Sequence, residues 1–130
     1  MRNLTLIALI CLAIPVAAGA QSITRGKYIV ERTSMCADCH TPRDEKGQLI
    51  VAQSLQGAPV GMKPIHPMPW AEVAPSIAGL PANFTLEQMV KFLQTGVRPN
   101  GTTPRPPMPP YRFSHEDAEA VTAYLRSMKK

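Results

Sequence analysis

A pair of cysteines with a histidine directly after it is the part of this sequence that can do chemistry. Cys36 and Cys39 are separated by two residues, and His40 follows at once. Two thiols at this spacing match the two vinyl groups of one porphyrin, and the adjacent imidazole is then directed under the ring, where its Nε2 can bind iron. Its Nδ1–H stays free to donate to a backbone carbonyl, which fixes the tautomer. The motif therefore predicts one covalently attached haem c.

Other uses of a close cysteine pair fit this chain less well. A thioredoxin-like redox pair belongs in a βαβ unit, and that pattern is missing from the sequence. A zinc site needs a fourth ligand and usually a second pair of ligands. The third cysteine, Cys11, lies in an apolar leader, so two cysteines are too few for a disulfide framework.

The iron of such a haem takes methionine, histidine or nothing as its second axial ligand. We expect Met108, because it lies far downstream of His40 and is surrounded by prolines. The prolines restrict the loop, so less entropy is lost when the thioether is fixed at the iron. Met68 and His66 are the alternatives. The remaining candidates are expected to fill the core, to face solvent or to lie in the wrong place: Met35, Met62, Met89, Met128 and His115.

Apolar spacing predicts three main helices. The first covers about Ser22 to Thr33, the second starts at Thr85 and stops at Gly96, and the third starts at Ser114. Thr85 with Gln88, and Ser114 with Asp117, have the form of capping boxes. The predicted inner faces consist of Ile23, Gly26, Ile29 and Val30, of Leu86, Met89, Val90 and Leu93, and of Ala118, Val121, Leu125 and Met128, with Tyr124 on the flank.

Prolines are concentrated in two stretches, one before the second predicted helix and one between the second and the third. Most of the 14 prolines lie in residues 56–81 and 97–113. Proline fixes φ and lacks the N–H, so these stretches are expected to run as stiff loops with no strand ladder. Loops of this length are uncommon in a small domain unless something organises them, and a cofactor packed between them would do so.

The first 20 residues of the 130 have the form of an export signal. Arg2 precedes an apolar run from Leu4 to Val16, and Ala18-Gly19-Ala20 predicts cleavage after Ala20. A retained anchor is the alternative, but the run is short for a membrane span. Residues 21–130 would form one domain in the periplasm. They carry 13 basic and 9 acidic side chains, a mild excess that favours an acidic partner and lacks the dense basic stripe of nucleic-acid binders.

Together these pieces resemble the class I c-type cytochromes, and more narrowly the single-haem cytochrome subunits of periplasmic dehydrogenases. The matching segments are Gly26-Lys27-Tyr28, Cys36 to Asp44, Pro107-Met108-Pro109, Phe113 to Asp117 and Ala123 to Arg126. The resemblance implies an all-α cytochrome c fold in which the N- and C-terminal helices cross. Gly26 would permit the close approach, and Tyr124 and Leu125 would pack there. It also implies that a proline carbonyl, best matched by Pro59, accepts the His40 Nδ1–H.

The function expected from this resemblance is transfer of single electrons, with no substrate bond made or broken. Electrons would come from a dehydrogenase and pass to an oxidase or another cytochrome of a respiratory chain. A basic ring could steer the partner, and Arg43 or Arg98 could pair with a haem propionate. The candidates for the ring are Arg25, Lys27, Arg43, Lys46, Lys63, Arg98, Arg105 and Arg112.

Two other functions are weighed against this one. The first is a haem-based binder or sensor of small gases with an open iron position; a four-helix haem sensor would carry its attachment motif near the C-terminus. The second is an enzyme such as a peroxidase, and a two-haem peroxidase would need a second C-x-x-C-H motif.

Overall fold

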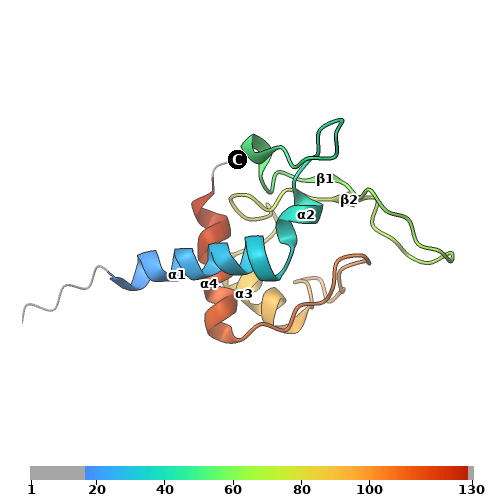
Figure 1. Ribbon diagram of the computed structural model, residues 1–130. Coiled ribbons are helices and arrows are strands. Elements are labelled where there is room, and N and C mark those ends of the chain that lie inside the picture. Colours follow the sequence, from blue (N-terminus) through green and yellow to red (C-terminus); the bar gives the residue numbers. More distant parts are fainter. Residues whose placement is uncertain (1–16, 129–130) are drawn as a thin grey trace, which may run out of the picture.

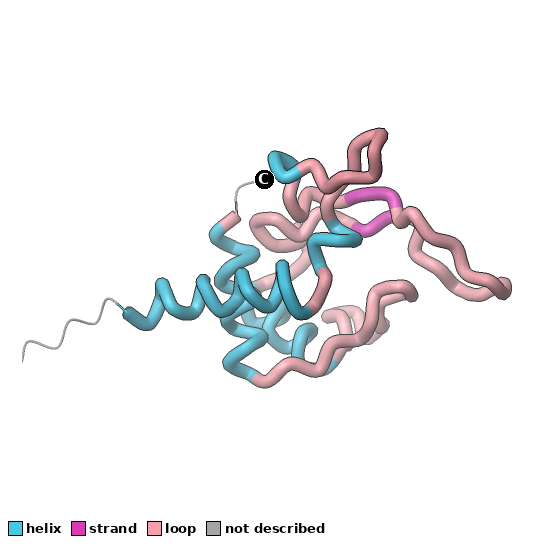
Figure 2. The backbone as a smooth tube through the Cα atoms, in the orientation of Figure 1, coloured by secondary structure: helices cyan, strands magenta, loops and turns pink. Residues whose placement is uncertain are grey.

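The computed structural model describes the backbone of residues 17–128 and the side chains of residues 22–128. Its helices are α1 (Ala17–Tyr28), α2 (Cys36–His40), α3 (Leu86–Thr95) and α4 (His115–Ser127). Figure 1 shows α1 crossing α4, with α3 packed beside α4. Figure 2 shows that loops make up most of the opposite side of the molecule. The expected all-α class is confirmed, and no helix in the described part of the chain is long and apolar enough to cross a membrane.

The first helix differs from its predicted bounds at the start. It begins at Ala17 and continues after Tyr28 as a π-helical turn, Ile29–Thr33, so the predicted end at Thr33 is confirmed. Most of the predicted leader lies outside the described residues. The predicted cleavage point after Ala20 falls within α1, so export and cleavage remain predictions.

The N-termini of α3 and α4 are capped as expected. The Thr85 hydroxyl accepts from the backbone N–H of Gln88 while the Gln88 side chain accepts from the Thr85 N–H, which completes a capping box. At α4 the Ser114 hydroxyl accepts from the Asp117 N–H. The carboxylate of Asp117 accepts from Arg25 of α1, 2.9 Å away, and no reciprocal bond to Ser114 is recorded. The predicted capping box at α4 is therefore incomplete, with only the bond from the Asp117 N–H to the Ser114 hydroxyl in place.

The crossing of α1 and α4 depends on the missing side chain of Gly26. A Cβ placed there would lie 1.9 Å from the backbone oxygen of Ala120 and 2.8 Å from Cβ of Tyr124. The two helix backbones can approach this closely only at glycine. Tyr124 and Leu125 are buried at this contact, as the resemblance implied. The Tyr124 hydroxyl also donates to the Glu31 carboxylate at 2.6 Å, which ties the end of the first helix to α4.

Two of the apolar positions predicted to be buried are more than one third exposed. Ile23 is 39% and Leu86 is 37% exposed, whereas Ile29, Val30 and Leu93 belong to the core. Ile23 and Leu86 line a shallow groove of about 530 Å³ between α1, α3 and α4. Both residues face this groove rather than the core, so correct spacing did not bring full burial.

The long loop after α2 contains a small sheet that was not expected. β1 (Ala58–Pro59) pairs antiparallel with β2 (Val73–Ala74), with Pro59 opposite Val73. The prediction that the segment 56–81 forms no ladder is therefore wrong. The ladder is only two residues long, and proline is tolerated in such a short edge pairing because few N–H groups are needed.

Leu55 anchors this loop to the helices. Its side chain is fully buried, and its backbone has a positive φ of 61°. The Leu55 N–H donates to the Thr41 hydroxyl at 3.0 Å, and its carbonyl accepts from the N–H groups of Ile77 and Ala78. The two ends of the loop are thereby held together at one buried point of the core.

We expect Gly26→Ala to lower the free energy of unfolding by about 2 kcal/mol or more, because the new methyl group collides with helix backbone rather than with a movable side chain. The gain of roughly 1 kcal/mol in helix propensity does not compensate. Denaturant unfolding followed by circular dichroism measures the change. The control is Gly61→Ala, where a Cβ meets nothing within 4 Å. Equal midpoints for the two variants would contradict this account of the crossing.

Candidate functional site

Helix α2 brings the three residues of the C-x-x-C-H motif to one face. Cys36 and Cys39 are three residues apart and His40 is four from Cys36, which are the spacings at which side chains share a helix face. All three line one cavity, and the two cysteines are not joined in a disulfide. Met35, just before the helix, has a left-handed backbone with φ of 54° and lines the same cavity. The residues of the motif, together with Met35, therefore form one wall of the cavity.

His40 is fixed in the orientation and tautomer that suit a metal ligand. Its side chain is buried, and its Nδ1 lies 2.7 Å from the carbonyl oxygen of Pro75. A carbonyl only accepts, so Nδ1 carries the proton and Nε2 keeps its lone pair. Burial lowers the pKa of His40, and the bond to Pro75 opposes this in part. The neutral, ligand-competent imidazole is therefore favoured at neutral pH.

The acceptor of the His40 proton is not the proline that was expected. Pro59 was the best match by sequence, but the carbonyl of Pro75 occupies that place, 35 residues from His40. The segment containing Pro59 contacts the histidine differently, because the N–H of Gly57 donates to the His40 backbone carbonyl at 2.7 Å. The β1–β2 ladder brings both segments to His40, one before β1 and one after β2.

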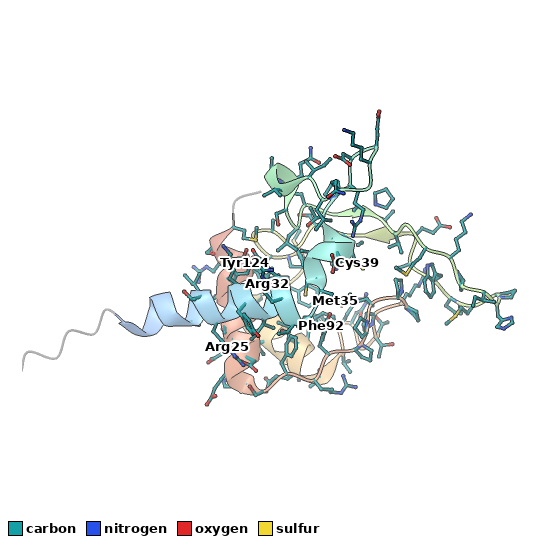
Figure 3. All side chains as sticks on the ribbon, in the orientation of Figure 1. Arg25, Arg32, Met35, Cys39, Phe92 and Tyr124 are labelled. Atoms are coloured by element: carbon teal, nitrogen blue, oxygen red, sulfur yellow. The ribbon has the colours of Figure 1, made fainter. Side chains whose placement is uncertain are left out.

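The cavity has a volume of about 890 Å³, near the upper end of the range of about 300–1,000 Å³ for cofactor and ligand pockets. Most of its walls are apolar. Figure 3 shows Met35 and Cys39 on the side of α2 and Phe92 on α3. Leu93, Val121 and Leu125 belong both to the cavity wall and to the buried core. A large, mainly apolar group placed here would continue the hydrophobic core of the protein.

Met108, the expected second ligand, is one of several methionines that line the cavity. It is half-buried, packs against the core and lines the cavity together with His40. The alternatives Met68 and His66 do not line the cavity, and Met68 is 49% exposed. His115 is at the start of α4, 3.2 Å from Glu119 and away from the cavity. Met35, Met62 and Met89 also line the cavity, the first two largely exposed and the third buried on α3.

Tyr111 is a site residue that the sequence did not reveal. Its hydroxyl donates to the backbone carbonyl of Ser34, two residues before Cys36, and its ring stacks on Phe113 with 4.8 Å between centroids. This bond joins the loop that carries Met108 to the segment that carries the cysteines. In the sequence, Tyr111 is only an aromatic residue three positions after Met108. Nothing in the local pattern indicates that its hydrogen-bond partner lies 77 residues away.

The surroundings of Cys36 disfavour a thiolate. Burial raises the pKa of Cys36 to about 11, and the Tyr111 hydroxyl opposes this only in part. Reactive cysteines that act as nucleophiles or redox pairs have a lowered pKa. These surroundings therefore do not favour Cys36 as a free nucleophile or as one half of a redox pair.

The predicted basic ring is only partly present around the cavity. Arg98 and Arg105 line it. Arg25 is paired with Asp117 at the helix crossing, and Arg43 contacts Asp38 and the carbonyl of Gly47. Arg98 and Arg105 are thus the cationic side chains that can meet an anionic group of a bound cofactor.

The donor set and the walls fit a porphyrin. Two thiols and an imidazole with a free Nε2 stand on one wall, a thioether stands elsewhere in the same lining, and the rest is mostly apolar with two arginines. Thioether and imidazole are the axial ligands of many single-haem carriers. The described residues therefore offer the ligands, the apolar surface and the cations that a haem with two propionates requires.

Comparison with known proteins leads to the same group. A family model described as cytochrome c matches residues 23–129. The chain is 33% identical over 119 residues to the fructose dehydrogenase cytochrome subunit of Gluconobacter japonicus. That match covers 89% of this chain but 23% of the subunit, so the chain spans about a quarter of its relative's length. Because the family model covers most of the sequence, this chain belongs to the cytochrome c family, whose members bind covalent haem c and carry electrons.

Proposed function

We propose that this protein is a periplasmic carrier of single electrons in which Cys36 and Cys39 hold one haem c through thioethers, with His40 and Met108 as axial ligands. The observation that carries the proposal is the shared lining of one cavity by all four side chains. The hydrogen bond from His40 to Pro75 supports the role of Nε2 as the proximal ligand.

A bound haem would supply reversible exchange between ferric and ferrous iron, and the side chains that hold it would set how easily that exchange occurs. A thioether from Met108 favours the ferrous state more than a second imidazole does. The apolar walls, including Phe92 and Leu93, exclude water and disfavour the additional positive charge of ferric iron. Arg98 and Arg105 would bind the propionate carboxylates through charge-assisted hydrogen bonds.

The relative supports the proposed electron donor, and the leader supports the proposed location. The relative is a cytochrome subunit of a dehydrogenase, so a dehydrogenase is the proposed donor. A respiratory oxidase or another cytochrome is the proposed acceptor. The N-terminal segment 1–20 has the form of an export signal, and export to the periplasm agrees with the covalent attachment of haem.

Intact-mass measurement of the exported product tests attachment. We expect one covalently added haem in the wild type and none in the Cys36→Ala/Cys39→Ala double variant, because both thioethers are then missing. The matched control is Cys11→Ala. It should leave both haem content and product mass unchanged, since Cys11 lies in the segment predicted to be removed. A wild-type product without added haem would refute the proposal, and a mass change in the control would refute the cleavage.

Met108→Ala tests the second axial ligand. The oxidised wild type should show the weak long-wavelength absorption band of a sulfur–iron bond, and the variant should lack it. We expect the potential to fall by on the order of 0.1 V, within the roughly 0.8 V that axial ligands span. The reduced variant should also bind carbon monoxide.

Two further methionine variants serve as controls for Met108→Ala. Met68→Ala alters an exposed residue outside the cavity, and Met89→Leu alters a buried one in its wall. Both should keep the band. Its loss in either of them alone would reassign the ligand, and a wild type that lacks it and binds carbon monoxide readily would favour a gas-binding function.

Tyr111→Phe tests the bond that joins the two halves of the site. Removing the hydroxyl leaves the Ser34 carbonyl without this partner, which should cost about 1–2 kcal/mol of unfolding free energy. The sulfur–iron band should be present in buffer but disappear at a lower denaturant concentration than in the wild type. Tyr28→Phe, at a residue that is 53% exposed, should change stability by less than about 0.5 kcal/mol. Equal behaviour of the two variants would show that the bond contributes nothing.

A further inference from the structure

Residues 60–72, which connect β1 to β2, form an arm that projects from the body of the protein (Figure 1). The base of the arm is closed by the N–H of Val60, which donates to the Glu72 carbonyl at 2.8 Å. Farther out, the indole N–H of Trp70 donates to the carbonyl of Met62 at 3.0 Å. The arm is therefore a hairpin held by bonds between its two sides.

The base of the arm lies beside the cavity. The N–H of Ala71 donates at 2.8 Å to the carbonyl of Pro106, two residues before Met108. Met62 and Trp70 line the cavity. Three prolines in the arm restrict its backbone, so little conformational entropy would be lost when it binds another molecule. They are Pro64, Pro67 and Pro69.

The outer part of the arm exposes large apolar side chains. Ile65 is 94% exposed, Met62 54% and Met68 49%. Single exposed apolar residues are ordinary, but a group of them on one projecting, preorganised segment marks an interaction site. These are flexible or branched aliphatic side chains, which fit an apolar hollow better than a polar surface.

The charges on the arm and around the cavity favour a partner with an acidic surface. Residues 46–71 and 88–115, which include the loop that carries Met108 and all of the arm except Glu72, contain no aspartate or glutamate. Lys63 lies on the arm, and Arg98 and Arg105 line the cavity. The acidic residue that lines the cavity, among those described, is Glu72 at the root of the arm. Such a surface complements carboxylates on a partner and repels cationic surfaces.

We propose that the arm is the docking element for the redox protein that exchanges electrons with this cytochrome. Met62, Ile65 and Met68 enter an apolar hollow on that protein, and carboxylates around the hollow meet Lys63, Arg98 and Arg105. A partner held in this way sits over the cavity that the arm's root lines. The inference rests on the proposed function, because it requires a haem in that cavity.

A protein fits these features better than a membrane does. Peripheral membrane binding requires a larger apolar face together with several cations beside it. The arm itself has three exposed aliphatic side chains and one lysine, and the arginines lie beside the cavity. Protein interfaces commonly have an apolar centre surrounded by polar or charged residues. The exposed apolar side chains of the arm and the arginines beside the cavity match this arrangement.

The test uses an electrode as a surface of defined chemistry and the haem-loaded protein. Films of mixed methyl- and carboxylate-terminated thiols represent an apolar surface with acidic groups, and hydroxyl-terminated films serve as the neutral reference. We expect the wild type to exchange electrons fastest on the mixed film. Ile65→Ser/Met68→Ser, which alters two exposed residues outside the cavity lining, should be slower there by about tenfold, as expected when central apolar contacts are lost. Reduction by ascorbate in solution should be unchanged.

Two variants serve as controls for the apolar and the charged parts. Val51→Ser removes another aliphatic side chain, 82% exposed and outside the cavity lining, and should exchange electrons as the wild type does. Lys63→Gln should reduce the salt dependence of the rate on the mixed film, because it removes one of the cations that meet carboxylates.

The outcomes of the test separate the docking role of the arm from a membrane contact and from a failure of the proposed function. A double variant with an intact sulfur–iron band and a wild-type rate on the mixed film would overturn the docking role and leave the proposed function standing. Equal losses in the double variant and Val51→Ser would also overturn it. If the wild type bound vesicles of phosphatidylglycerol and phosphatidylcholine and the double variant did not, with equal electrode rates, the arm would be a membrane contact. A wild type without covalent haem would instead defeat the proposed function itself.

Discussion

The structure around the cavity depends on the way His40 is held at two points. Its ring donates to Pro75, just after β2, and its backbone carbonyl accepts from Gly57, just before β1, each at 2.7 Å. Gly57 has a φ of 92°, and a Cβ there would lie 2.8 Å from the N of Ser76. The short ladder therefore closes against α2 only with glycine at this position, and the same ladder carries the arm.

The cavity also explains how so small a core can organise such long loops. Several core side chains of α3 and α4, including Leu93, Val121 and Leu125, form cavity wall as well. In a small domain, too little apolar surface is available to order long proline-rich segments by packing among themselves. A bound haem would extend the core across the cavity to Met108 and Pro75. The loops would then enclose a cofactor, which explains why they need little regular secondary structure beyond the short β1–β2 ladder.

The sequence allowed prediction of features set by neighbours along the chain, and failed on those set by distant partners. The capping box of Thr85 and Gln88 and the stop at Gly96 depend on local residue types, and the structure agrees with them. Met108 lines the cavity, and its role as a ligand stays a prediction. Pro75 and Pro59 look alike locally, and only the ladder decides which carbonyl meets His40. Ile23 and Leu86 follow the right spacing, but periodicity does not tell where a neighbouring helix ends. The Tyr111 bond spans 77 residues and leaves no local pattern.

The distribution of charge matters more than its total. Acidic side chains are used at the helix crossing, where Asp117 binds Arg25 and Glu31 accepts from Tyr124. An exposed ion pair of this kind adds little stability, but it neutralises a cation on that side of the molecule. Glu72 is the acidic residue among the described residues that line the cavity, and the described ion pairs do not involve Lys63, Arg98 or Arg105. Lys63, Arg98 and Arg105 therefore supply positive charge where an electron partner would approach, and this charge can orient the partner.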